Sequence, residues 1–166
     1  CAGGDVKAVV EALNSNNASF AREFFEVEYS MDASIHKYPK PIVVLGQGYT
    51  MGGGLGIFSG ATARVLTQNS VLSMPETFIG FFADVGASLF LNRMPGSIGL
   101  FLALTGYRFS ANDAFDLGLA THLVPSSFQS TNLSKLTSSS WSSASDILNS
   151  NHQKSADTLA INLLDF

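Results

Sequence analysis

Gly46-Gln47-Gly48-Tyr49-Thr50-Met51-Gly52-Gly53-Gly54 decides the fold of this chain, together with Met74-Pro75-Glu76-Thr77 further along. The apolar run at 41–45 predicts a strand before the first stretch, and residues 55–58 continue it as a helix. Glycines at a strand-to-helix junction let another group approach the backbone closely. They also leave N–H groups at the helix start that can bind a developing oxyanion. With Glu76 as base or nucleophile, the two stretches indicate acyl chemistry.

Length and composition favour one globular domain. The 166 residues are 46% hydrophobic and 13% charged, which is enough apolar material for a sizeable core. The net charge of −4 gives no basic field for nucleic acid or an anionic membrane. No apolar run reaches the length of a membrane span. Cys1 is the only cysteine, so an intramolecular disulfide is impossible and a reducing compartment is expected. We therefore expect no nucleic-acid partner and no membrane partner.

Short predicted strands alternate with helices, which indicates an α/β fold. The hydrophobic spacing predicts helices at 6–13, 19–35, 85–93 and 98–104, and strands at 41–45, 63–66, 71–74 and 121–124. In the second helix an apolar face is expected, because Phe20, Phe24, Val27 and Met31 recur at helical spacing.

Two boundaries follow from the composition of the second half. The segment 110–113 resembles a capping box that opens a helix at 114–117, with Gly118 as its stop. After Pro125 the chain becomes rich in Ser and Asn, so we predict a core at 1–125 and a tail at 126–166 with short helices near 145–148 and 158–164. Apolar tail residues such as Ile147 and Leu148 need a partner on another element or another subunit, which leaves a homo-oligomer open.

Several common catalytic motifs are absent. The glycines near Gly54 only approach the dinucleotide fingerprint, there is no phosphate-binding Gly-Lys-Ser, and Ser59 is wrongly spaced for a serine-hydrolase elbow. The three histidines lack metal-ligand spacing, so no metal site is predicted.

Two carboxylates remain as candidates, Glu76 and Asp84. An apolar segment, 78–82, separates them, so burial and mutual repulsion should raise the pKa of at least one. Each feature also has a simpler interpretation. Glu76 could be a solvated turn residue, Asp84 a helix N-cap, and the glycine triplet 52–54 a site of tight packing.

These motifs together resemble the crotonase (enoyl-CoA hydratase/isomerase) superfamily. The similar segments, in order, are 1–5, 51–56, 74–77, 84–86, and 101–106 followed by 118–122. The resemblance extends to about residue 127. It implies a crotonase-like ββα-superhelix (spiral) fold, truncated at the N-terminus and also at the C-terminus.

Within the superfamily, the chain looks most like the 3-hydroxyisobutyryl-CoA hydrolases. Hydratases carry a glutamate where this chain has Gly56, and usually a glycine where it has Asp84. One departure is Ala83, where the hydrolases usually have proline. The resemblance implies hydrolysis of a short branched 3-hydroxyacyl-CoA thioester, with 3-hydroxyisobutyryl-CoA of valine catabolism as the best guess. An enoyl-CoA hydratase/isomerase and a catalytically incomplete crotonase-like fragment are the alternatives.

The resemblance also implies roles for individual residues. The N–H groups of Gly4 and Gly53 would form the oxyanion hole. Glu76 would attack the thioester carbonyl or activate water, and Asp84 would hold the 3-hydroxyl group of the substrate.

Substrate binding would involve three further residues, Ala2, Asp5 and Val6, on the adenine and pantetheine side. No metal or other cofactor is implied, since CoA arrives as part of the acyl-CoA substrate. The expected location is the cytoplasm for a bacterial protein and the mitochondrial matrix for a eukaryotic one.

The 166-residue chain on its own is expected to be catalytically weak and to self-associate. Members of the superfamily have strands before the position of Cys1 and helices after the tail, and without them an edge and apolar surface are exposed. Light scattering and a thioester hydrolysis assay on one sample test this expectation. A stable monomer with full turnover would contradict it.

Overall fold

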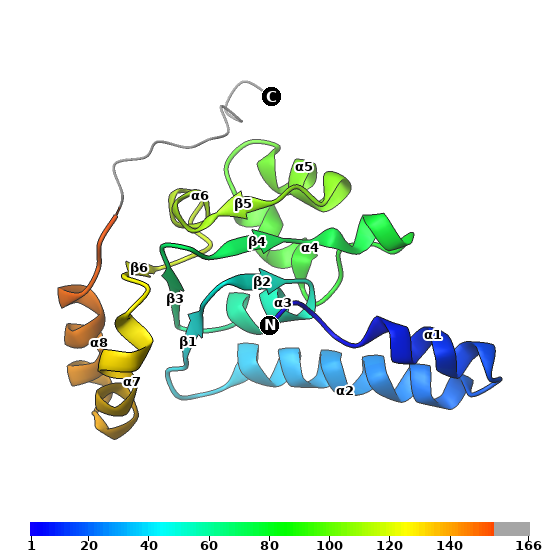
Figure 1. Cartoon of the computed structure of the whole chain (residues 1–166), viewed down its shortest axis with the longest axis horizontal. Coiled ribbons are helices and arrows are strands. Elements are labelled where there is room, and N and C mark those ends of the chain that lie inside the picture. Colours follow the sequence, from blue (N-terminus) through cyan, green and yellow to red (C-terminus); the bar gives the residue numbers. More distant parts are fainter. Residues whose placement is uncertain (155–166) are drawn as a thin grey trace.

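The computed structural model of the protein describes residues 1–154. Within them, one sheet contains three parallel strands in the order β1 (Val43–Gly46), β3 (Ala63–Thr67) and β6 (His122–Val124). In the other sheet, β2 (Tyr49–Met51) runs parallel to β4 (Val71–Ser73), which pairs antiparallel with β5 (Phe109–Ser110). The chain alternates between the sheets from β1 to β4 and so winds as a spiral (Figure 1).

Helices connect and cover these strands. Those among and beside the strands are α3 (Gly53–Ser59), η1 (Pro75–Ile79), α4 (Ala87–Phe90), η2 (Leu91–Arg93), α5 (Ile98–Thr105) and α6 (Ala111–Asp116). A long pair, α1 (Val6–Asn14) and α2 (Ala18–Lys37), lies along one side of the molecule (Figure 1). A second pair, α7 (Phe128–Ser138) and α8 (Trp141–Ser150), lies beside the β1-β3-β6 sheet (Figure 1).

Most predicted elements are confirmed, but some elements were missed and some boundaries differ. Strands β2 and β5 were not predicted, because two or three residues are too few for a periodic pattern. Helix α7 was also missed in the Ser-rich tail. The helix predicted from Val85 begins at Ala87, because Val85 (φ +43°) and Gly86 (φ +83°) have left-handed backbone conformations that a right-handed helix excludes.

The expected apolar face of α2 is not its buried face. Phe20, Val27 and Met31 are 40%, 63% and 41% exposed. The residues that α2 buries are Ala21 and Asp32. Spacing alone identified the helix correctly, but the neighbouring elements decided which face is covered.

The core lies between the two sheets and the helices that connect them. Its fully buried members include Leu55, Phe58, Leu66, Leu72 and Leu102.

A smaller apolar cluster joins the tail helices to the β1-β3-β6 sheet. It contains Val65 and Val124 from the sheet, Phe128 from α7 and Leu148 from α8, with Ile147 packed against it. Of the apolar tail residues singled out in the sequence, Ile147 and Leu148 therefore find partners within the chain, and the others lie outside the described residues. The division at residue 125 stays a prediction, and the helix predicted at 158–164 lies outside the described residues.

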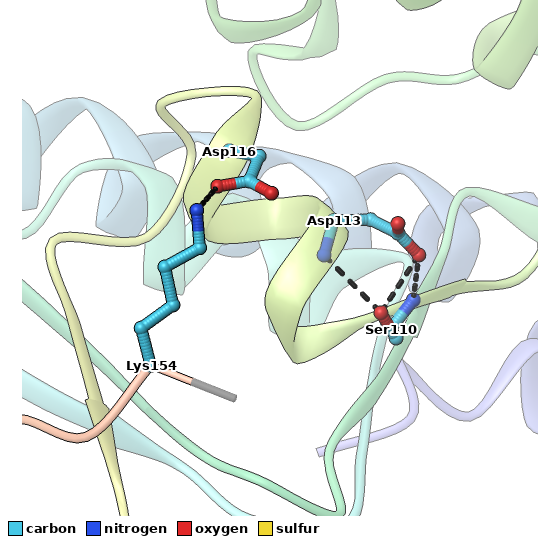
Figure 2. Close-up of polar contacts among 4 residues, drawn as sticks. All are labelled: Ser110, Asp113, Asp116 and Lys154. Carbon is cyan, nitrogen blue, oxygen red and sulfur yellow. Dashed lines mark hydrogen bonds and ion pairs between the residues drawn. The ribbon is translucent and has the colours of Figure 1, made fainter. Parts of the chain in front are cut away.

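The capping box predicted around Ser110 is present. Asp113 N donates to Ser110 Oγ over 3.1 Å, and Ser110 N donates to Asp113 Oδ2 over 2.8 Å (Figure 2). Because Ser110 is the N-cap, α6 begins at Ala111 rather than at residue 114. Gly118 follows the helix with φ +76°, as a C-terminal stop requires.

The end of the described chain is bound to α6 and β6. Lys154 Nζ lies 2.5 Å from Asp116 Oδ1 (Figure 2). Gln153 N donates to Leu123 O over 2.8 Å, and Leu123 N donates to His152 Nδ1 over 3.0 Å. These bonds satisfy backbone groups of β6, an edge strand that would otherwise expose them.

Asp32 is a buried acid, and neither carboxylate oxygen has a hydrogen-bond partner among the described residues. Burial raises the pKa of Asp32 to about 6, and the charges of Glu28 and Asp84 add to the effect. The ordinary pKa in an unfolded chain is about 3.9. The folded state therefore binds the proton more tightly, and stability is lost as pH rises between these two values.

We predict that Asp32→Asn stabilises the fold above about pH 7 by roughly 1–3 kcal/mol, because it removes the cost of ionising a buried, unpaired acid. Below about pH 4 the gain should vanish, since Asp32 is then neutral in both states. Urea unfolding at the two pH values measures the difference. Asp146→Asn, on the exposed side of α8, is the control. Loss of stability in Asp32→Asn at neutral pH would show that the charge has a partner.

Candidate active site

A cavity of about 430 Å³ is bounded by residues 2–4, α1, α2, the start of α3, η1 and the segment after η1. Its walls are mainly apolar. Six of the residues predicted for the site line it, namely Ala2, Gly4, Val6, Gly53, Glu76 and Asp84.

The parallel pairing of β2 and β4 brings the two decisive stretches of sequence together. Met51 pairs with Ser73, so both strands end at the same edge of the sheet. Gly52 N donates to Ser73 O over 3.2 Å across this edge. The glycine triplet and the segment that carries Glu76 therefore leave the sheet side by side.

The first residues of the chain lie against the glycine triplet. Met51 N donates to Cys1 O over 3.0 Å. A Cβ atom built on Gly53 would lie 3.7 Å from Gly4 N, and one built on Gly3 would lie 3.7 Å from Gly53 N. The backbone amides of Gly4 and Gly53 are thus close neighbours, and neither donates to an acceptor among residues 1–154.

At Gly52 and Gly53, any residue with a side chain would collide with a neighbouring glutamate. A Cβ atom on Gly52 would lie 2.9 Å from Glu76 Oε1, and one on Gly53 would collide with Glu28 Oε1. Gly52 also has φ +53°, which L side chains rarely adopt. Both glycines are therefore needed for the backbone and the acids to approach each other.

Glu76 is buried on η1, which excludes its interpretation as a solvated turn residue. Its Oε2 atom has no hydrogen-bond partner in the described part of the chain. Burial raises the pKa of Glu76, a backbone hydrogen bond partly opposes this, and the charges of Asp84 and Glu28 raise it further. The expectation that one of the two acids has a raised pKa is confirmed.

Asp84 lies in the irregular segment between η1 and α4. Its Oδ2 atom accepts a hydrogen bond of 2.6 Å from the Tyr29 hydroxyl group. Gly86 is the N-cap of α4 and Asp84 provides no side-chain cap, so the simpler interpretation of Asp84 is wrong. Val85 packs on α3, because a Cβ atom at Gly56 would lie only 2.6 Å from Val85 Cβ.

Asp5 is placed differently from the other predicted residues. It precedes α1 and accepts a hydrogen bond of 3.1 Å from Ala8 N, so its carboxylate caps the helix. It is not among the residues that line the cavity. Its role in substrate binding stays a prediction.

Sequence reasoning missed the contribution of α2. Glu28 lines the cavity, Tyr29 bonds to Asp84, and Asp32 is buried close by. Burial raises the pKa of Glu28, and the charge of Asp84 adds to this. The spacing of Phe25, Tyr29 and Asp32 puts them on one side of a helix, a signal that the apolar pattern at Phe20 and Val27 obscured.

Two further features concern only residues 1–154. None of their helices is both long and apolar enough to span a membrane. No three of their His, Cys, Asp and Glu side chains are grouped so that they could hold a metal ion. The groups that line the cavity are thus acids, backbone amides and apolar side chains.

Curated relatives carry hydrolase names. The chain is 43% identical over 160 residues to "3-hydroxyisobutyryl-CoA hydrolase, mitochondrial" of Xenopus tropicalis, covering 93% of this chain and 41% of that protein. It is 47% identical over 126 residues to the protein of the same name of Danio rerio, covering 76% and 33%. The chain thus spans about two fifths or less of the length of these relatives.

Solved structures show the fold. A carnitinyl-CoA dehydratase from Mycobacterium thermoresistibile is 38% identical, with a TM-score of 0.79, over 99% of this chain and 46% of the other. An enoyl-CoA hydratase from Rhodobacter sphaeroides is 34% identical, with a TM-score of 0.76 and the same coverage. The family model for enoyl-CoA hydratase/isomerase matches residues 1–163. The spiral of paired strands, the glycine-lined cavity and these matches show that the chain belongs to the enoyl-CoA hydratase/isomerase family and has the crotonase fold.

Proposed function

We propose that this chain carries the catalytic site of an acyl-CoA thioester hydrolase that acts on a short branched 3-hydroxyacyl-CoA, best 3-hydroxyisobutyryl-CoA in valine catabolism. The observation that carries the proposal is one cavity that Glu76, Asp84, Gly4 and Gly53 all line. The names of the curated relatives support the same substrate.

In the proposed complex, the thioester carbonyl oxygen lies between the N–H groups of Gly4 and Gly53. Both amides lack acceptors among the described residues and are close to each other. Preorganised donors of this kind stabilise the oxyanion in the transition state by about 3–4 kcal/mol each.

Glu76 then acts in one of two ways. As a nucleophile its carboxylate attacks the carbonyl carbon and expels the CoA thiolate, and water hydrolyses the resulting anhydride. As a base it takes a proton from the water that attacks the carbonyl. Either route consumes one water and yields the free acid and the CoA thiol. The raised pKa of Glu76 makes it a stronger base in its ionised form.

Asp84 accepts the hydrogen bond of the substrate 3-hydroxyl group. It lines the cavity, and among residues 1–154 only its Oδ2 atom has a hydrogen-bond partner, Tyr29. A site built around a hydroxyl group favours substrates that carry one.

A second candidate function is hydration of an enoyl-CoA, which uses two carboxylates around one water. Glu28 and Glu76 both line the cavity, and this observation favours it. Against it, the position of the first hydratase glutamate is Gly56, where any side chain would collide with Val85. Release of CoA thiol from a panel of acyl-CoA thioesters, compared with loss of enoyl-CoA absorbance, decides between the two.

The proposed location follows the relatives. Several are named as mitochondrial, which supports the matrix for a eukaryotic protein, with the cytoplasm as the bacterial equivalent.

We predict that Glu76→Gln lowers kcat of thioester hydrolysis by at least a hundredfold and changes binding of a non-hydrolysable CoA ester little. A group that acts in the transition state affects kcat rather than ground-state affinity. In the unsubstituted protein, kcat should rise with pH up to the raised pKa of Glu76, because only the ionised form reacts. Stopped-flow or steady-state release of CoA thiol measures both. Near-normal turnover of Glu76→Gln would remove this residue from the mechanism.

For Asp84 we expect substrate discrimination. Asp84→Asn should lower kcat/KM for 3-hydroxyacyl thioesters at least tenfold more than for the matching acyl thioesters without the hydroxyl group, because the lost interaction involves that group. Paired assays on the two substrates measure the ratio. Asp146→Asn on α8 serves as the matched control. Equal losses on both substrates would exclude Asp84 as the partner of the hydroxyl group.

A further inference from the structure

Four aromatic rings connect α2 with the segment that carries Asp84. We call Phe25 and Tyr29 of α2, with Phe81 and Phe82 of that segment, the aromatic clamp. The Phe25 and Tyr29 rings lie one helical turn apart on α2, with centroids separated by 5.7 Å. Phe25 stacks on Phe81 at 5.8 Å, and Phe81 stacks on Phe82 at 4.3 Å. The clamp therefore joins α2 to the segment that carries Asp84.

That segment has little structure of its own. Between η1, which ends at Ile79, and α4, which begins at Ala87, no helix or strand is formed. Its backbone turns through three left-handed conformations, at Gly80 (φ +72°), Val85 (φ +43°) and Gly86 (φ +83°). Contacts from outside the segment must therefore fix the direction of the Asp84 side chain.

The Tyr29 hydroxyl group makes that contact. Its 2.6 Å bond to Asp84 Oδ2 is the one side-chain hydrogen bond of Asp84 in the described part of the chain. Burial raises the pKa of Tyr29 above its usual value, and the bond to Asp84 adds to this, so the phenol keeps its proton at any pH at which the enzyme works. A phenol that always donates can hold one carboxylate oxygen in a fixed direction through a short, charge-assisted hydrogen bond.

Three other acids lie near Asp84. Glu28, Asp32 and Glu76 each repel it. Among the other titratable groups of α2, His36 lies near the end of the segment, with its Nε2 atom 3.8 Å from the position of a Cβ atom on Gly86. Tyr29 is the group that donates a hydrogen bond to Asp84 against this repulsion.

We propose that Tyr29 is a positioning residue, whose hydroxyl group fixes the direction of the Asp84 carboxylate through Oδ2 and leaves Oδ1 to accept the 3-hydroxyl group of the substrate. The proposal rests on the function proposed above for Asp84. It assigns specificity for the hydroxyl group to the pair and not to Asp84 alone. Tyr29 itself need not touch the substrate.

Tyr29→Phe tests the proposal, because it keeps the ring in the clamp and removes only the hydroxyl group. We expect kcat/KM for a 3-hydroxyacyl-CoA to fall 10- to 100-fold, and for the matching acyl-CoA less than threefold. Combining Tyr29→Phe with Asp84→Asn should cost little more than Asp84→Asn alone, since both changes remove one interaction. Tyr38→Phe, at an exposed tyrosine directly after α2, is the matched control.

A second measurement does not depend on activity. Calorimetric binding of a non-hydrolysable 3-hydroxyacyl-CoA analogue and of the matching analogue without the hydroxyl group should show that Tyr29→Phe weakens affinity for the first about tenfold more than for the second. Equal losses of kcat/KM on both substrates, or equal changes in affinity for the two analogues, would overturn the positioning role. If the unsubstituted protein hydrolyses no thioester, the proposed function fails, and the two affinities still decide whether Tyr29 positions Asp84 for a ligand hydroxyl group.

Discussion

The parallel pairing of β2 with β4 is the constraint on which the site depends. Met51 and Ser73 are paired, and the bond from Gly52 N to Ser73 O fixes the two chains where they leave the sheet. Two stretches that are distant in sequence thereby become neighbours, one bringing backbone amides and the other Glu76. Because neither group can reach the other without this register, a slip by one residue would destroy the site while leaving each motif intact.

The glycines allow the segment that follows β2 and the segment that carries Glu76 to lie this close together. Side chains at 52 and 53 would meet Glu76 and Glu28, and a side chain at Gly56 would displace Val85. Each of these glycines leaves room for a different neighbouring residue. The same stretch can therefore pack tightly and also present backbone N–H groups to the cavity. The simpler interpretation of the triplet, as tight packing, and the functional one are thus compatible.

The acids in and near the cavity destabilise the fold, but they give the site groups that can react. Several acids lie near one another in an apolar setting, and burial raises the pKa of Glu28, Asp32 and Glu76. Such clusters cost folding free energy and are found mainly where a reaction needs them. Glu28 and Asp32 are the members of this cluster that have no part in the proposed hydrolysis. The large apolar core beneath the cavity offsets such costs.

The sequence by itself determined the α/β class, most helices and strands, the capping box at Ser110, and the candidacy of Glu76 and Asp84. These depend on local patterns or on short motifs with fixed spacing. Only the tertiary structure decided that Glu28 lines the cavity, that Tyr29 bonds to Asp84 and that Asp32 is buried. The periodicity of apolar residues shows that a helix has an apolar face, but it does not show which element covers that face. The burial of α2, and the partner of Asp84, were therefore set by contacts between residues more than fifty positions apart.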